Sequence, residues 1–131
     1  MNGKWFGLVV LMAVAAALLT QPSCARPQQL VLIQIQPPTY TFLSADPALV
    51  ADFTAIGTYI HPPATKDITA EVTWSSDSTN MVTVAGGVVS PTGNECGVVN
   101  ISASYNRGTQ NGSDVIGYAT VQVDGTAVGC P

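Results

Sequence analysis

Residues 49–60, with the sequence LVADFTAIGTYI, contain the alternation that decides the fold class of this chain. Apolar or small side chains stand at every second position, namely at Leu49, Ala51, Phe53, Ala55, Gly57 and Tyr59. Thr54, Ile56 and Thr58 occupy the positions between them. A period of two residues is that of a β-strand with one face in a core. The stretch therefore predicts a half-buried strand.

Similar stretches lie on both sides of this one and predict further strands over Leu30 to Gln36, Thr39 to Leu43, Ile68 to Trp74, Met81 to Val84, Val88 to Ser90, Val98 to Tyr105 and Val115 to Asp124. Pro37-Pro38 confines the first strand to a sheet edge or makes it change sheets. Residues 61–67 contain Pro62-Pro63, so we expect them to form a loop outside the ladder. About seven or eight strands, with turns about every ten residues, predict an all-β fold, an immunoglobulin-like β-sandwich with Greek-key topology.

The first 25 residues have the pattern of a secretory signal peptide. Lys4 precedes an uninterrupted apolar or glycine run from Trp5 to Leu19, and small or polar residues follow from Thr20 to Cys24. A transmembrane anchor needs about 20 apolar residues, and this run ends earlier. We therefore expect export, with residues 1–25 as the signal peptide and residues 26–131 as the domain.

Two cleavage sites are compatible with the end of this segment. Gln21-Pro22-Ser23-Cys24 resembles a bacterial lipobox, in which Cys24 becomes the acylated N-terminus, although Gln21 and Pro22 depart from the usual residues. Ser23-Cys24-Ala25 instead satisfies the small-x-small rule, and cleavage there leaves Arg26 as the first residue. In the first case a lipid on Cys24 is the only membrane contact that we expect. In the second the domain is periplasmic or secreted.

The cysteine count agrees with export. The chain has 3 cysteines, and both cleavage sites account for Cys24, which leaves Cys96 and Cys130 in an oxidising compartment. We expect a disulfide between these two, since a cysteine next to the last residue is poorly placed for core packing. The bridge would close a loop of about 35 residues, which stabilises by about 4 kcal/mol in the chain-entropy model. The alternative is two separate buried cysteines.

Composition excludes several classes of function. Only 9% of the residues are charged, and 8 acidic side chains outnumber 4 basic ones, so we expect no nucleic-acid partner. The only histidine, His61, lies in the proline-containing loop without a nucleophile beside it in the sequence. Asp46, Asp77, Asp114 and Asp124 lie in or beside predicted turns, without the DxDxD spacing of a calcium site. We therefore expect no enzyme, no metal site and no cofactor.

Several sequence blocks occur in an order and spacing that resembles the bacterial immunoglobulin-like domains of group 2. The blocks are Ala55-Ile56-Gly57-Thr58-Tyr59, Asp67-Ile68-Thr69, Val72-Thr73-Trp74-Ser75-Ser76-Asp77, Met81-Val82-Thr83-Val84, Gly87-Val88-Val89-Ser90 and Gly97-Val98-Val99-Asn100-Ile101-Ser102-Ala103. The resemblance covers Leu30 to Asp124. It implies a β-sandwich used as a spacer, display platform or binding module, without catalytic residues. Such domains usually occur in tandem, and their pattern does not require a Cys96–Cys130 bridge.

The resemblance implies a non-catalytic module of the bacterial cell envelope, active in structural display or adhesion. Its partner would be a surface protein or a polysaccharide, bound by loops at one end, by a strand edge or by a Thr/Ser-rich face such as those carrying Thr54, Thr58, Thr69 and Thr73. The alternative is a carbohydrate-binding accessory module, which would need exposed aromatic residues in a row.

The aromatic residues provide one candidate for a binding residue. Trp74 is in phase with apolar neighbours, so we expect it in the core rather than stacked on a ligand. Tyr40, Phe42, Phe53, Tyr59 and Tyr105 also fall on inward-facing positions. Tyr118 shares a face with Ile116 and Thr120, opposite the apolar residues of the last strand. We therefore expect Tyr118 to be exposed, and it is the one candidate for a binding residue.

Overall fold

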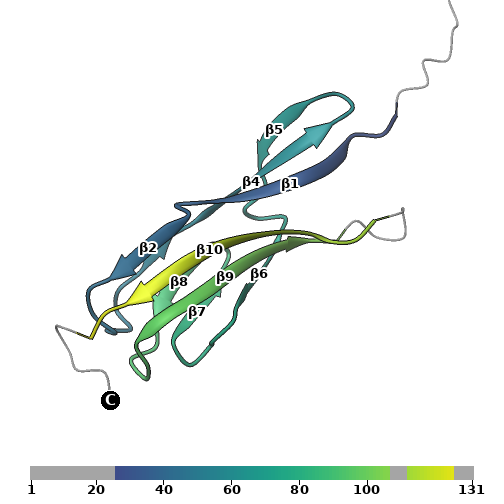
Figure 1. Ribbon diagram of the computed structural model, residues 1–131. Coiled ribbons are helices and arrows are strands. Elements are labelled where there is room, and N and C mark those ends of the chain that lie inside the picture. The colour runs from purple at the N-terminus through teal and green to yellow at the C-terminus, as the bar shows by residue number, and fades with distance from the viewer. Residues whose placement is uncertain (1–25, 107–111, 126–131) are drawn as a thin grey trace, which may run out of the picture.

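Ten β-strands and no helix make up the described part of the chain, residues 26–106 and 112–125 of the computed structural model (Figure 1). The strands are β1 (Gln29–Gln36), β2 (Thr39–Phe42), β3 (Ala51–Asp52), β4 (Thr54–Ile60), β5 (Ala64–Asp67), β6 (Thr73–Ser76), β7 (Val82–Ala85), β8 (Val88–Pro91), β9 (Gly97–Tyr105) and β10 (Val115–Val123). The all-β class is therefore confirmed. Among these residues there is no helix long and apolar enough to cross a membrane.

The strands form three small sheets. The first has the order β1-β4-β5, the second β2-β10-β9-β6 and the third β3-β8-β7. Neighbouring strands are antiparallel except β2 and β10, which run parallel. The molecule is elongated, and at one end the β4–β5 hairpin extends together with the first residues of β1, which pair with β4 (Figure 1).

Two chain segments each pass from one sheet to another. Pro37-Pro38 separates β1, which pairs with β4, from β2, which pairs with β10. Contact with the second sheet begins at Pro38 itself, because the Pro38 carbonyl accepts from the Thr120 N–H of β10 at 3.0 Å. Of the two predicted effects of the prolines, the change of sheet is thus confirmed, and β1 also lies at an edge of its sheet. The predicted strand 49–60 divides in the same way at Phe53, which separates β3 from β4 and donates its N–H to the Gly87 carbonyl at 2.8 Å.

One hydrophobic core lies between the inward faces of the sheets. Its largest fully buried side chains include Phe53, Ile68 and Ile101. Alternating residues of β9 and β10 supply one side of this core, namely Val99, Ile101, Ala103, Val115, Ala119, Val121 and Val123. Burial of such alternating apolar side chains is the main stabilising contribution in a sheet packing of this kind.

Sheet packing is closest where β1 crosses β10. A Cβ atom on Gly117 would lie only 2.6 Å from the Ile33 carbonyl oxygen and 2.8 Å from the Ile33 Cγ2 atom. Gly57, which pairs with Ile33 in the β1–β4 ladder, is also buried against side chains, those of Leu30 and Ile68. The glycine at position 117 therefore allows β1 to lie directly on the second sheet.

The expected loop 61–67 is wrong for its second half. His61, Pro62 and Pro63 form a turn, with His61 at φ 61°. The chain then returns as β5, in which Ala64 pairs with Tyr59 and Asp67 with Ile56. The prolines thus occupy the turn of a hairpin, where a fixed φ is favourable and no ladder donor is required.

The expected strand from Ile68 to Trp74 is also wrong over its first five residues. The Ile68 carbonyl accepts from the N–H groups of Glu71 at 2.8 Å and Val72 at 3.2 Å, which closes a helix-like turn. Ile68 is buried as predicted, whereas Ala70 is exposed. Only from Thr73 does the chain enter a strand, β6.

Candidate functional site

The outward face of the β2-β10-β9-β6 sheet is the broadest regular surface of the described chain, and we call it the uncharged face. Along β10, every second residue is buried, as Val121 and Val123 are, and the residues that alternate with them point toward solvent. Its members are Thr39 and Thr41 of β2, Ile116, Tyr118, Thr120 and Gln122 of β10, Val98, Asn100, Ser102 and Ser104 of β9, and Thr73 and Ser75 of β6.

Strand register arranges these residues in rows across the sheet. Ser102 pairs with Tyr118 on one side and with Ser75 on the other, which brings three hydroxyl groups into one row. Neighbouring strands are about 4.8 Å apart, so the row extends over about 10 Å. In the adjacent row Thr120 pairs with both Asn100 and Thr39.

Hydrogen bonds within the face leave several polar groups directed to solvent. The Thr120 hydroxyl donates to the Asn100 Oδ1 atom at 3.2 Å, and the Ser104 hydroxyl donates to the Thr73 carbonyl at 3.4 Å. Within the described residues, the hydroxyl groups of Ser75, Ser102 and Tyr118 make no hydrogen bond to another protein group. These three hydroxyls are thus available to a ligand or to water.

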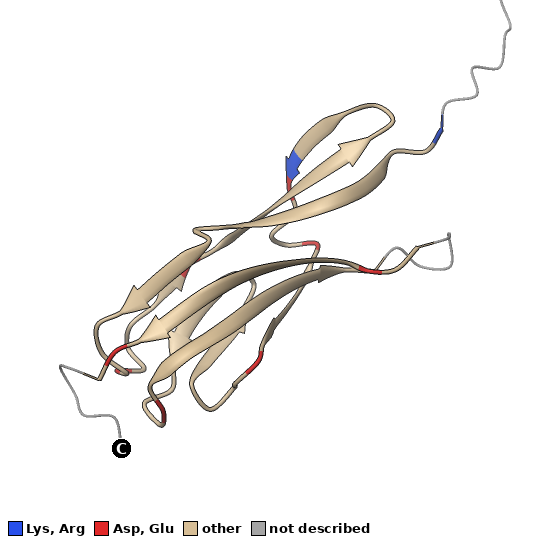
Figure 2. Cartoon of the chain, in the orientation of Figure 1, with Lys and Arg blue, Asp and Glu red and all other residues tan. Residues whose placement is uncertain are grey.

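The uncharged face has no charged side chain, a property that it shares with strands β1, β4, β7 and β8. None of the residues in β2, β6, β9 and β10 is charged. The acidic residues nearest in sequence, Asp77, Asp114 and Asp124, lie beyond the ends of these strands, and Figure 2 shows the strands themselves entirely in tan. Ligand contacts with this face would therefore be hydrogen bonds and apolar contacts, without ion pairs.

Tyr118 has the exposure that its position in the sequence predicts. Its side chain is 62% exposed, and Ile116, the previous outward residue of β10, is 44% exposed. The two form a small apolar patch at one end of the uncharged face. Whether Tyr118 binds a ligand stays a prediction.

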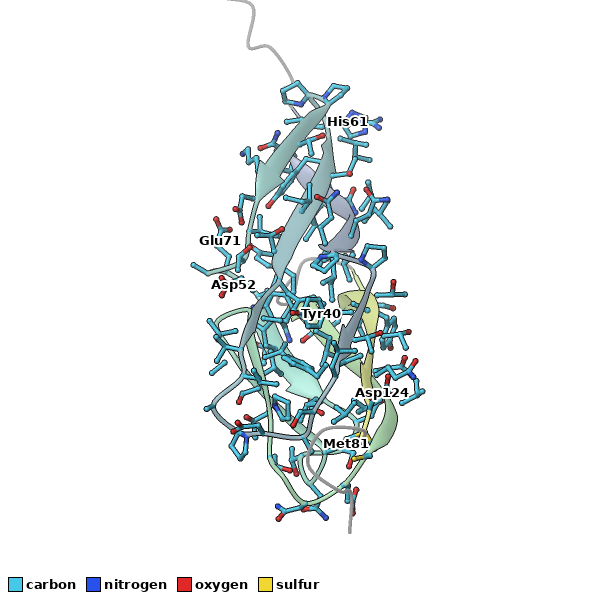
Figure 3. The ribbon with its side chains drawn as sticks, turned by 90° about the vertical axis from the view of Figure 1, so that its left-hand side faces the viewer. Tyr40, Asp52, His61, Glu71, Met81 and Asp124 are labelled. Carbon is cyan, nitrogen blue, oxygen red and sulfur yellow. The ribbon has the colours of Figure 1, made fainter. Side chains whose placement is uncertain are left out.

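The other aromatic residues within residues 26–106 and 112–125 serve packing, with one partial exception. Trp74 packs against the core and donates its Nε1–H to the Thr69 carbonyl at 3.0 Å, in agreement with its expected structural role. Phe42 and Phe53 are buried. Tyr40 is exposed by 38%, yet its ring lies edge-on to Phe42, with ring centroids 4.9 Å apart. Tyr40 therefore lies at the margin of the core in the middle of the molecule (Figure 3).

The four threonines expected on Thr/Ser-rich faces do not assemble into one surface. Thr54 and Thr58 lie on β4, whereas Thr73 lies on β6 in a different sheet. Thr69 is half-buried in the turn after β5, where its hydroxyl accepts from the Ala55 N–H at 2.9 Å. Only Thr73 belongs to the uncharged face.

Asp67 is the one carboxylate of the described chain whose pKa is clearly lowered. Its Oδ1 atom accepts from the Thr69 hydroxyl at 2.6 Å and from the Thr69 N–H at 2.9 Å. Both bonds stabilise the ionised form, so the pKa of Asp67 lies below its ordinary value of 3.8. Because these bonds fix the turn after β5, the role of this carboxylate is structural.

Tyr59 also has a shifted pKa. Burial, and to a lesser extent the nearby Glu71 and Tyr105, raise the pKa of Tyr59 above 10.0. The ring carries the Lys66 ammonium group at 4.9 Å from its centroid, and Lys66 in turn donates to Gln28 at 2.8 Å. These contacts connect the strands of the β1-β4-β5 sheet.

His61 and the acidic turn residues form no assembled centre. His61 lies at the tip of the β4–β5 hairpin, far from Met81 near the opposite end of the molecule (Figure 3). Across residues 26–106 and 112–125, no three His, Cys, Asp or Glu side chains gather as metal ligands would.

The predicted cysteine sites fall partly outside the described residues. Cys96 is half-buried and packs against the core just before β9. Its predicted partner Cys130 and the predicted lipidation site Cys24 both lie outside the described residues, as does the whole signal peptide. The Cys96–Cys130 bridge and the lipid anchor therefore stay predictions.

Comparison with known proteins adds no further assignment. No protein-family model matches the chain, and no curated protein matches it in sequence.

Proposed function

We propose that this chain is an exported, immunoglobulin-like β-sandwich of the bacterial cell envelope. Its function is non-catalytic, either the display of its own surface or the binding of a surface protein or polysaccharide. The resemblance of residues 30–124 to bacterial immunoglobulin-like domains and the signal-peptide pattern of residues 1–25 support this proposal.

Strand order supports the immunoglobulin-like part of the proposal. In that fold, strands A, B, E and D form one sheet and strands C, F and G the other. If β3 and β4 are taken as two pieces of strand B, the pairings β1-β4 and β3-β8-β7 give the order A-B-E-D. The order β10-β9-β6 then corresponds to G-F-C, with β2 added beside G. On this assignment, the β4–β5 hairpin is an extension of strand B.

The single observation that carries the binding function is the uncharged face. It extends across four strands, bears free hydroxyl groups and includes the exposed Tyr118. Rigid strands hold its side chains in fixed rows, so a ligand would meet groups that are already positioned.

A carbohydrate-binding accessory module remains the second candidate function. Tyr118 on the uncharged face favours it, because an exposed ring beside hydroxyl groups suits the contact surface of a sugar. Against it stands the lack of a row of exposed aromatic rings on the described part of this face.

The proposed function is tested by binding of the processed protein to its own cell envelope. We expect envelope material from the exporting cell to retain the protein, and Ser102→Asp to weaken retention because it introduces a charge into the centre of the face. Val50→Ala is the matched control, since Val50 is 61% exposed and lies outside the four strands. Equal retention of all three proteins would contradict binding through this face. No retention of any would leave display as the function.

A further inference from the structure

We propose that the uncharged face binds a neutral polysaccharide, with the Ser75–Ser102–Tyr118 row at the centre of the contact. This inference rests on the proposed function, that of a surface-binding module, and specifies the chemical class of its ligand. It is argued from the charge, the hydrogen-bonding groups and the apolar patch of the face.

The charge of the face selects against ionic polymers. An acidic polysaccharide or a nucleic acid carries regularly spaced anions, and binding them requires Lys or Arg side chains in a matching arrangement. The four strands have none, and the whole chain has a net charge of −4, which repels polyanions. A cationic polymer would likewise find no carboxylate within the strands. A neutral ligand can bind this face without leaving any charged group unpaired.

The polar groups of the face match a ligand rich in hydroxyl groups. Ser75, Ser102 and Tyr118 each offer a hydroxyl that both donates and accepts, and Asn100 adds an amide group two residues from Ser102 along β9. Residues two apart on a strand are separated by about 6.7 Å and neighbouring strands by about 4.8 Å, which gives a regular grid of such groups. Sugar hydroxyls can bond to this grid directly or through bridging water.

The apolar patch supplies the complementary contact. Tyr118 presents its ring beside Ile116 on the same strand, with both side chains largely outside the core. One face of a pyranose ring consists of C–H groups, which pack against an aromatic ring while the hydroxyls point to the sides. Tyr118 would therefore support one sugar residue, while the serines of the same row bind its hydroxyl groups.

A protein partner fits this face less well. The centres of protein interfaces are enriched in aromatic residues, Met and Arg and depleted in Ser, because a few large buried side chains contribute most of the affinity. The uncharged face has one aromatic residue among many hydroxyl groups. Its composition therefore favours a wet contact with a hydroxylated polymer.

Affinity electrophoresis of the processed protein tests this inference. The gels would contain a neutral β-glucan, a neutral xylan or dextran, or the acidic polymers alginate and pectin, each at low and at high salt. We expect at least one neutral polysaccharide to slow migration to the same extent at both salt concentrations. We expect no effect of alginate or pectin.

Variants then locate the contact. Tyr118→Ala removes the ring and Ser102→Asp introduces a charge, and each should weaken neutral-polysaccharide binding by about tenfold or more, the range of a residue at the centre of an interface. Tyr118→Phe keeps the ring and should retain most of the binding. Val50→Ala should bind as the unchanged protein does, and circular dichroism would show that each variant is folded.

The outcomes separate this inference from the proposed function. Absence of binding to every neutral polymer, together with envelope retention that Ser102→Asp weakens, would overturn the polysaccharide assignment and leave the proposed binding module intact. Salt-sensitive binding to alginate or pectin would also overturn it, as would neutral-polysaccharide binding that Tyr118→Ala and Ser102→Asp leave unchanged.

Discussion

Asp67 and Thr69 give the clearest case of one side chain fixing local structure. Both Thr69 donors stabilise the ionised Asp67 carboxylate, so its pKa is lower in the folded than in the unfolded chain. The resulting stability is present above the unfolded pKa of about 3.8 and is lost as the pH falls through the folded value. We predict that an NMR titration of Asp67 has its midpoint below 3.8.

Thr69→Val provides the matching variant for this titration. It removes the hydroxyl donor and keeps the N–H donor, so the pKa of Asp67 should move part of the way back toward 3.8. Thr65→Val on the exposed strand β5 should leave the titration unchanged. A midpoint at or above 3.8 in the unchanged protein would rule out this role of Thr69.

Gly117 is a residue at which a single added methyl group should be costly because of contact with another strand. In Gly117→Ala the added Cβ meets the Ile33 carbonyl oxygen at 2.6 Å, and backbone cannot move aside without shifting β1. We predict a loss of about 2–3 kcal/mol in the free energy of unfolding, the range of overpacked cores, measured by urea titration.

Gly57→Ala is the matched comparison for Gly117→Ala. Its Cβ would meet the ends of the Leu30 and Ile68 side chains, both at 2.8 Å, and these can rotate. The loss in unfolding free energy should therefore be smaller than that of Gly117→Ala. The reverse order would show that β1 yields more easily than the side chains around Gly57.

At the scale of elements, the sequence predicted strands well where one face is buried along their whole length. β9 and β10 were expected within one residue of their observed ends, because an apolar or small residue recurs at every second, inward-facing position of each. The alternation from Ile68 to Trp74 gave a wrong prediction of a strand over residues 68–72. Ile68 and Val72 are four residues apart, and this spacing also places two side chains on one side of a helix-like turn. Period alone does not distinguish the two.

Strand β5 was not predicted from the sequence, for a different reason. Its sequence, ATKD, has no buried apolar face, and its strand conformation depends on pairing with β4 after the proline turn. Such pairing is a tertiary effect that overrides local propensity. The division of residues 49–60 into β3 and β4 is of the same kind, since the Gly87 carbonyl that binds Phe53 comes from a distant part of the sequence.

Hydrogen exchange should separate the elements by their packing. β9 lies between two neighbours and its inward face is buried, whereas β5 is a short edge strand with three exposed residues of four. We predict that amide groups of β5 exchange at least tenfold faster than those of β9, because local opening of an exposed edge does not disrupt the core. Equal protection in the two strands would mean that the β4–β5 hairpin opens only with the whole fold.

At the scale of the whole molecule, the candidate site depends on the register in which the strands of the β2-β10-β9-β6 sheet pair. Tyr118 could be chosen from the sequence because its phase within one strand is visible there. The row that it forms with Ser102 and Ser75 could not, because three segments distant in sequence meet only through the pairing of β10, β9 and β6. The shared outward phase of Asn100, Ser102 and Ser104 was the available signal, yet it did not say which strand would lie beside β9.

The start of β1 lies beside the β4–β5 hairpin, because Gln29 pairs with Ile60. Charges of both signs occur in this part of the chain, since Lys66 is followed by Asp67 at the end of β5. If Cys24 carries a lipid, the few residues between it and β1 reach at most about 18 Å. The hairpin end of the molecule would then lie close to the membrane.

This arrangement depends on the processing of Cys24, which intact mass spectrometry of the protein from its native membrane fraction determines. We predict the mass increment of a diacyl or triacyl group on a chain that begins at Cys24. Cleavage after Ala25 would instead give an unmodified chain starting at Arg26, and the hairpin end would then not be held at a membrane. In the same spectra, reduction should add about two mass units, one hydrogen for each sulfur of a Cys96–Cys130 bridge. An unchanged mass on reduction would show that these two cysteines are not joined, and the C-terminal segment would then lack this covalent link to the core.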